Sequence, residues 1–173
     1  MSGNESAENH CAECGFDYRT EEAHRAAAAI RAGVTEMAAT LDDCPDARRR
    51  RTPELWSPLE YGCHVRDVLL VQRERVLLAR RSDTPALVTM GRDERGEHDG
   101  YADQDPAEVA GELIAAARLL ANVLDRLGDD WHRSVLYNYP DTTERDLRWV
   151  AVHTVHEVRH HLLDIRRQLV GAG

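Results

Sequence analysis

The residues with the clearest chemical potential lie near the C-terminal end of the sequence. The segment VHEVRHH covers Val155–His161, and within it residues 156–160 read H-E-V-R-H. Two histidines four residues apart on a helix can bind one ion, and in zinc metalloproteases the intervening glutamate acts as general base. The extended protease motif carries a further histidine downstream, but no histidine follows His161. The pattern therefore predicts a metal site and disfavours a protease.

Several of the nine histidines fall in this same segment. At helical spacing His153, His156 and His160 share one face, whereas His161 turns away from it. The helical rise separates His153 from His160 by about 10 Å, which is too far for both to bind one ion directly. We predict that His156 and His160 bind the metal and that a third ligand comes from upstream.

His64, in the segment GCHVRD, is the best upstream candidate, because it lies in the middle of a predicted helix and faces the interior. Three neutral imidazoles would leave one coordination position open, as in catalytic zinc sites. Four further residues are candidates for hydrogen bonding to a ligand or for contact with a substrate, namely Asp67, Arg66, Glu157 and His153. The sequence assigns no separate catalytic residue.

A second pattern of potential ligands lies at the N-terminal end. The segment CAECG places Cys11 and Cys14 in a C-x-x-C motif followed by glycine, which is half of a tetrahedral zinc site. His161 faces away from the first histidine stripe and could complete a second metal site, as could His10, His24 or another histidine of the last helix. The alternative is two free thiols on a mobile arm.

Helix-forming patterns predict the elements that must position these residues. Helices are expected at Thr20–Leu41, Pro58–Arg81, Pro106–Leu127 and Thr143–Val170. The second and third begin with S-P-L-E and D-P-A-E, each a cap residue, a proline and a glutamate. The only strand candidate is Ala86–Met90. We predict an all-α four-helix bundle over residues 20–173, with long crossover loops and an N-terminal arm over residues 1–19.

Composition limits the classes of function. The net charge is −9, which argues against binding to nucleic acid because that affinity depends on basic residues. No segment approaches the length of a membrane span, and the polar, acidic N-terminus does not resemble a signal peptide. We therefore expect a cytoplasmic protein with reduced cysteines. All 22 Lys and Arg residues are Arg, which indicates a genome of high G+C content.

Two of these segments together carry a family resemblance. WSPLEYGCHVRDVLL, followed later by HEVRHHLLDI, resembles the DinB-like metal-dependent superfamily of four-helix bundles over residues 16–169. That superfamily includes mycothiol- and bacillithiol-dependent S-transferases and mycothiol-dependent maleylpyruvate isomerases. Its metal motif, one histidine from the second helix and an H-x-x-x-H pair from the last, corresponds here to His64, His156 and His160.

The resemblance implies a divalent metal, zinc or nickel, that activates a low-molecular-weight thiol by deprotonating it. The composition suggests an actinobacterial source, where mycothiol is the usual thiol. The leading hypothesis is therefore a thiol-dependent transferase or isomerase acting on a small molecule, with homodimerisation through the bundle also expected. The alternatives are a hydrolase using metal-bound hydroxide with Glu157 as base, and a non-catalytic, metal-stabilised, ligand-binding bundle.

Overall fold

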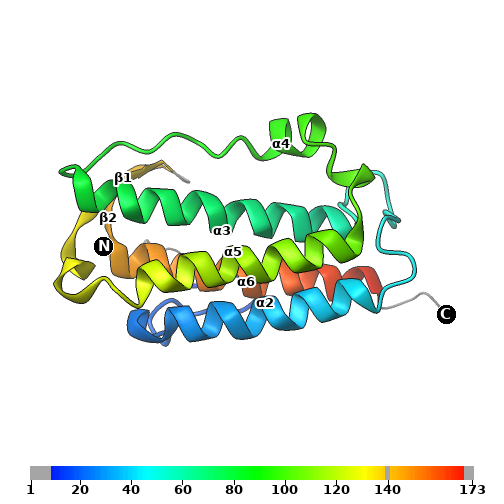
Figure 1. The fold of residues 1–173 in the computed structure, drawn as a ribbon, viewed down its shortest axis with the longest axis horizontal. Helices are drawn as coiled ribbons and strands as arrows, with labels where there is room; N and C mark the ends of the chain where they lie inside the picture. The colour runs from blue at the N-terminus through cyan, green and yellow to red at the C-terminus, as the bar shows by residue number, and fades with distance from the viewer. Residues whose placement is uncertain (1–8, 139–140, 170–173) are drawn as a thin grey trace.

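Four long helices form the body of the protein in a computed structural model that describes residues 9–138 and 141–169. They are α2 (Ala26–Asp42), α3 (Pro58–Arg81), α5 (Pro106–Leu124) and α6 (Leu147–Leu169). In Figure 1, α2 and α6 run in one direction and α3 and α5 run in the other. Helices α2 and α3 each pack mainly against α5 and α6. The predicted all-α four-helix bundle is confirmed.

Capping groups explain why α3 and α5 begin where the sequence predicts. At the start of α3 the Glu60 amide donates to Ser57 Oγ at 3.3 Å, and the Ser57 amide donates to the Glu60 carboxylate at 2.8 Å. At the start of α5 the Asp105 carboxylate accepts from the amides of Ala107 and Glu108, at 3.0 and 3.1 Å. These contacts satisfy amides that a helix N-terminus otherwise leaves unpaired.

The predicted start of the last helix was wrong, because residues 142–146 form a strand. Strand β1 (Ser134–Asn138) pairs antiparallel with β2 (Thr142–Asp146). Helix α6 starts only at Leu147, where the Asp146 carboxylate accepts from the Trp149 amide at 2.8 Å. Its predicted end at Val170 lies outside the described residues. The strand candidate Ala86–Met90 forms only a single parallel bridge, from Ala86 to Leu136.

The segments between the helices also differ from simple loops. A short 3-10 helix, η1 (Ala23–Arg25), precedes α2, so the first α-helix begins later than predicted. The connection from α3 to α5 runs back beside α3 and carries α4 (Arg92–His98) and η2 (Tyr101–Asp103) (Figure 1). A third 3-10 helix, η3 (Gly128–His132), leads into β1.

Small aliphatic side chains fill the bundle interior. The buried core is dominated by Ala, Leu and Val, with few aromatic rings, which agrees with the low aromatic content of the sequence. Across the described residues, every helix is too short or too polar to cross a membrane. The division into an arm at 1–19 and a bundle at 20–173 stays a prediction, since residues 1–8 and 170–173 lie outside the described part.

Candidate metal centre

One group of possible metal ligands joins α3 to α6. His64 on α3 meets Glu157 and His161, which lie one turn apart on α6, and the three ligand atoms all fall within 4.8 Å of one another. Glu157 Oε2 lies 4.0 Å from His64 Nε2 and 3.7 Å from His161 Nε2. Ligand atoms around a zinc ion at bond lengths of about 2.0–2.2 Å lie roughly 3–3.5 Å apart. Small rotations would therefore bring this group to coordination distances.

The protonation states of two of these side chains, His64 and Glu157, suit metal binding. Burial lowers the pKa of His64 to about 3, so its imidazole is neutral, and its buried Nδ1 has no hydrogen-bond partner in the described structure. Burial would raise the pKa of Glu157, but hydrogen bonds to His156 and His161 outweigh it and hold the pKa well below the usual value. The group thus combines a neutral imidazole with an ionised carboxylate.

Asp164 orients the third side chain of this group. His161 Nδ1 lies 3.0 Å from Asp164 Oδ2. Although burial acts to raise the pKa of Asp164, the hydrogen bond to His161 outweighs it and lowers that pKa. An ionised carboxylate can only accept, so Nδ1 carries the proton and Nε2 is left to face Glu157. Carboxylates commonly fix metal-binding histidines in this way.

The other oxygen of Glu157 faces a different pair of histidines. Glu157 Oε1 lies 3.7 Å from His153 Nε2 and 3.6 Å from His156 Nδ1. Tyr18, from the N-terminal arm, places its hydroxyl 2.8 Å from His153 Nδ1 and 3.0 Å from His156 Nδ1. One hydroxyl therefore ties the arm to two imidazoles of α6. His153 thus contacts the Glu157 carboxylate, as a residue that supports a ligand would.

A large cavity opens over these residues. It has a volume of about 1030 Å³ and is lined by the His64 group together with parts of the arm, α3, the α3–α5 connection and the hairpin. Its wall includes the basic residues Arg75, Arg92 and Arg145, and the aromatic residues Tyr137 and Trp149. The volume is sufficient for a small organic molecule.

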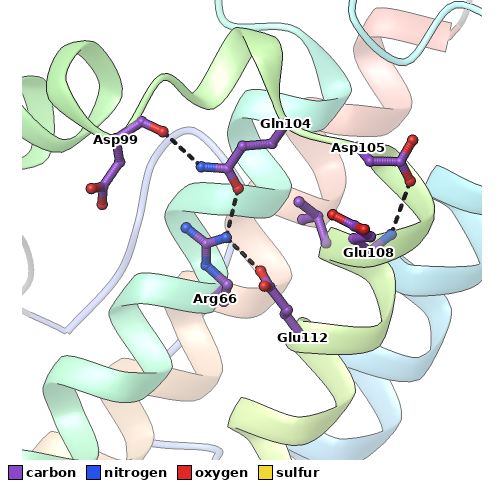
Figure 2. Close-up of a pocket in the computed structure, with 7 residues that line it drawn as sticks. Arg66, Asp99, Gln104, Asp105, Glu108 and Glu112 are labelled. Atoms are coloured by element: carbon purple, nitrogen blue, oxygen red, sulfur yellow. Dashed lines mark hydrogen bonds and ion pairs between the residues drawn. The ribbon is translucent and has the colours of Figure 1, made fainter.

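Arg66 takes part in a separate network beside α5 (Figure 2), and its neighbour Asp67 is bonded to it. Arg66 donates to Gln104 at 2.7 Å, to Glu112 at 2.6 Å and to Asp67 at 2.9 Å. The buried Asp67 also accepts from the Tyr101 hydroxyl at 2.7 Å. These bonds fasten η2 and α5 to α3. In the described structure none of the hydrogen bonds of Arg66 or Asp67 goes to one of the histidines. Both residues therefore hold neighbouring elements together and do not contact the candidate ligands.

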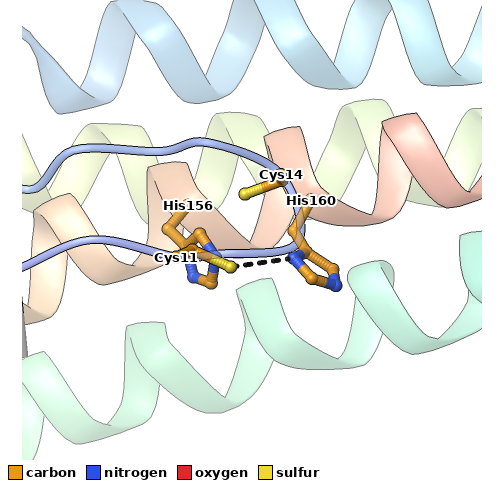
Figure 3. Close-up of side chains that lie close together, drawn as sticks. All are labelled: Cys11, Cys14, His156 and His160. Carbon is orange, nitrogen blue, oxygen red and sulfur yellow. Dashed lines mark hydrogen bonds between the residues drawn. The ribbon is translucent and has the colours of Figure 1, made fainter. Parts of the chain in front are cut away.

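A second group of possible ligands joins the N-terminal arm to α6 (Figure 3). The ligand atoms of Cys11, Cys14, His156 and His160 all lie within 4.8 Å of one another, and Cys11 Sγ is 3.6 Å from His160 Nδ1. Burial acts to raise the pKa of Cys11, but hydrogen bonds involving the Cys14 backbone and the His156 ring outweigh it and lower the pKa to about 6. Burial raises the pKa of Cys14 to about 11, and its contact with Cys11 adds to the rise.

The structure groups the sequence-predicted ligands differently from the prediction. His64 does not join His156 and His160 in any of the ligand groups found among residues 9–138 and 141–169. Its partners are Glu157 and His161, the adjacent i, i+4 pair on α6. Conversely, His156 and His160 face the arm and join Cys11 and Cys14, so His161 is not the histidine that meets the cysteines. Two overlapping groups, His153–His156–Glu157 and His160–His161–Asp164, share members with these and would compete with them.

Sequence reasoning missed two residues that contact the candidate ligands. Asp164 follows His161 by three residues on α6, a spacing that would have identified it as a hydrogen-bond partner. Tyr18 reaches His153 and His156 only because the arm folds back over α6, and no local pattern signals such a contact.

Comparison with known proteins gives two matches. A family model described as the DinB superfamily matches residues 17–165. Among solved structures, the fold is similar to YfiT from Bacillus subtilis, described as a probable metal-dependent hydrolase with an unusual four-helix bundle topology. The TM-score is 0.69 with 16% sequence identity, and the match covers 82% of this chain and 85% of that one. A search of curated proteins gave no significant match.

Proposed function

From the premise that this chain belongs to the DinB superfamily, we propose that it is a metal-dependent enzyme whose ion is bound by His64, Glu157 and His161. One observation carries the proposal: three ligand atoms from α3 and α6 converge beside a cavity of about 1030 Å³. Two imidazoles and one carboxylate form a known catalytic zinc ligand set, in which a position stays open for substrate.

The protein's own residues supply ligand geometry and substrate binding. Asp164 holds the proton on His161 Nδ1, and Glu157 contributes negative charge that offsets the charge of the cation. The cavity wall carries the basic residues Arg75, Arg92 and Arg145 and also acidic residues, among them Glu13, Asp93, Glu94 and Asp141, so it offers partners to charged groups of either sign on a substrate or thiol. A divalent ion held by these residues would lower the pKa of a thiol or water molecule bound to it.

The finer proposal is that the activated group is a low-molecular-weight thiol, and that the reaction is a transfer or isomerisation of a small molecule. Mycothiol is the thiol that the Arg-only composition suggests, with zinc or nickel as the metal. A hydrolase is the second candidate, favoured by the description of the YfiT structure. In that case Glu157, as a ligand, is not free to act as the base that an H-E-x-x-H motif would assign.

The test compares metal content and reactivity in three forms of the full chain, purified without a histidine tag. His161→Ala should lose one zinc or nickel ion per chain together with thiol-dependent turnover of an electrophile. His24→Ala, at an exposed histidine outside the site, should retain both. If His161→Ala retains all its metal, the proposal fails. Thiol-independent ester hydrolysis by the parent favours the hydrolase, and metal without either activity favours a non-catalytic bundle.

A further inference from the structure

We propose that Cys11, Cys14, His156 and His160 form a second, structural zinc site that fastens the N-terminal arm to α6. Its function differs from that of the His64 group, because four protein ligands close a zinc ion's coordination whereas catalytic sites leave a position open. The ion expected at this site is a borderline-soft divalent cation, for which two thiolates and two imidazoles are a preferred donor set.

The spacing of the donor atoms fits a zinc tetrahedron. At Zn–S bonds of about 2.3 Å and Zn–N bonds of about 2.0–2.1 Å, a sulfur and a nitrogen ligand lie roughly 3.6 Å apart. Cys11 Sγ and His160 Nδ1 are separated by 3.6 Å, and all four donor atoms fall within 4.8 Å of one another. The side chains converge from two sides, the cysteines from the arm and the histidines from α6 (Figure 3).

The backbone around the cysteines already has the shape of a tight metal-binding turn. The Gly15 amide donates to the Cys11 carbonyl at 2.8 Å, and the Cys11 amide donates to the Phe16 carbonyl at 2.9 Å. Gly15 has φ +75°, a left-handed conformation that glycine adopts without strain. This turn places both thiols next to the histidines of α6.

The two imidazoles are oriented by groups that leave one nitrogen of each ring for the metal. Tyr18 Oη holds His156 Nδ1 at 3.0 Å, and the buried His156 Nε2 has no hydrogen-bond partner in the described structure. Carboxylate oxygens of Glu13 and Asp164 lie 3.3 and 3.5 Å from His160 Nε2, so Nδ1 is the nitrogen that faces Cys11. An orphaned buried nitrogen is destabilising, and a bound cation would satisfy it.

The site would also shape the cavity over the His64 group. Cys11, Ala12, Glu13 and Tyr18 form part of the cavity wall, and they belong to an arm with little secondary structure of its own. The arm is also held by the packing of Phe16, by the Tyr18 hydroxyl on His153 and His156, and by a hydrogen bond from Arg167 to the Glu13 carbonyl at 3.0 Å. A zinc ion at its turn would keep this wall closed.

The experiment measures zinc per chain and the absorption spectrum of the cobalt-substituted protein, with the full chain kept reduced. We expect the parent to bind one zinc ion more than the double variant Cys11→Ser, Cys14→Ser, and to show thiolate-to-cobalt charge-transfer bands. Cys44→Ser, which alters a cysteine outside the group, should leave both unchanged. His64→Ala should keep the charge-transfer bands, so failure of the first site is distinguishable from failure of this one.

Two results would overturn the proposal. One is an equal zinc content in the parent and the double cysteine variant. The other is the absence of thiolate-to-cobalt bands in the parent, a measurement that still decides the question if the double variant does not fold. Further support would come from limited proteolysis. Zinc should protect the arm of the parent from cleavage, a chelator should remove this protection, and His64→Ala should be protected as the parent is.

Discussion

Asp164 contacts one imidazole from each candidate metal group. Its Oδ2 lies 3.0 Å from His161 Nδ1 and 3.5 Å from His160 Nε2. A carboxylate in this position fixes the ring orientation and raises the basicity of the nitrogen that faces the metal. Asparagine preserves the shape but removes the charge, so its effect isolates the electrostatic contribution.

We predict that Asp164→Asn weakens metal binding by about 10- to 100-fold, the range typical for loss of such a partner. Competition with a chromogenic chelator measures the apparent affinity of each site. Asp46→Asn, which alters an exposed aspartate paired with Arg49, is the matched control and should bind as the parent does. Unchanged affinity in Asp164→Asn would show that this carboxylate does not support the ligands.

At the scale of the element, α3 carries His64 and depends on the group that caps its start. The buried Glu60 carboxylate accepts from the Ser57 amide and pairs with Arg50. Burial acts to raise the pKa of Glu60, but the hydrogen bonds to Arg50 and Ser57 outweigh it and lower the pKa below the usual value. A depressed carboxylate pKa contributes stability above the unfolded pKa, and this contribution is lost as pH falls through the folded value.

Glu60→Gln should therefore reduce the free energy of unfolding by about 1–3 kcal/mol at neutral pH, the range for bonds to a charged group. The difference from the parent should shrink as pH falls from the unfolded glutamate value of about 4.3 through the lower folded value, where the parent's glutamate also becomes protonated. Urea unfolding at several pH values measures this, with exposed Glu54→Gln as the control. A difference that stays constant down to acid pH would contradict the assigned charge.

Elements whose signals are local in sequence were predicted well. Helix α3 has the predicted bounds Pro58–Arg81 because its serine, proline and glutamate are all within the first turn. The hairpin was missed because the strand at 142–146 is stabilised by pairing with residues 134–138, and three of its five side chains are exposed. A mainly exposed strand lacks the alternating apolar pattern by which strands are recognised in sequence.

The candidate site was only partly predictable for a related reason. The residue types and their helical spacing indicated metal ligands, but α6 offers two i, i+4 pairs, 156/160 and 157/161, about 100° apart around the helix. Which pair faces His64 depends on how α6 is rotated against α3 and the arm. That rotation is decided by packing of the whole bundle, which no local spacing encodes.

At the scale of the whole molecule, the interior holds imidazoles that resist protonation. Burial lowers the pKa of His153 to about 4, well below the value of about 6.5 for an unfolded chain. Between these values the unfolded state binds a proton that the folded state does not, so stability rises with pH across this window and falls on acidification. The shift corresponds to at most about 3–4 kcal/mol.

In metal-free protein, His153 should therefore contribute a fall in the free energy of unfolding as pH is lowered from about 6.5 to 4, and His153→Gln should remove this contribution. The raised pKa values of His156 and His161 act in the opposite direction, so the comparison of the variant with the parent isolates the effect of His153. Glutamine can still accept a hydrogen bond from Tyr18 but does not titrate. Stability that the variant loses through altered packing is therefore the same at every pH, whereas loss of the titrating group changes the slope of the free energy of unfolding against pH. His24→Gln, at an exposed position, should follow the parent at every pH. If His153→Gln and the parent lose stability in parallel, His153 does not drive the acid sensitivity, and other buried groups of the bundle must carry it.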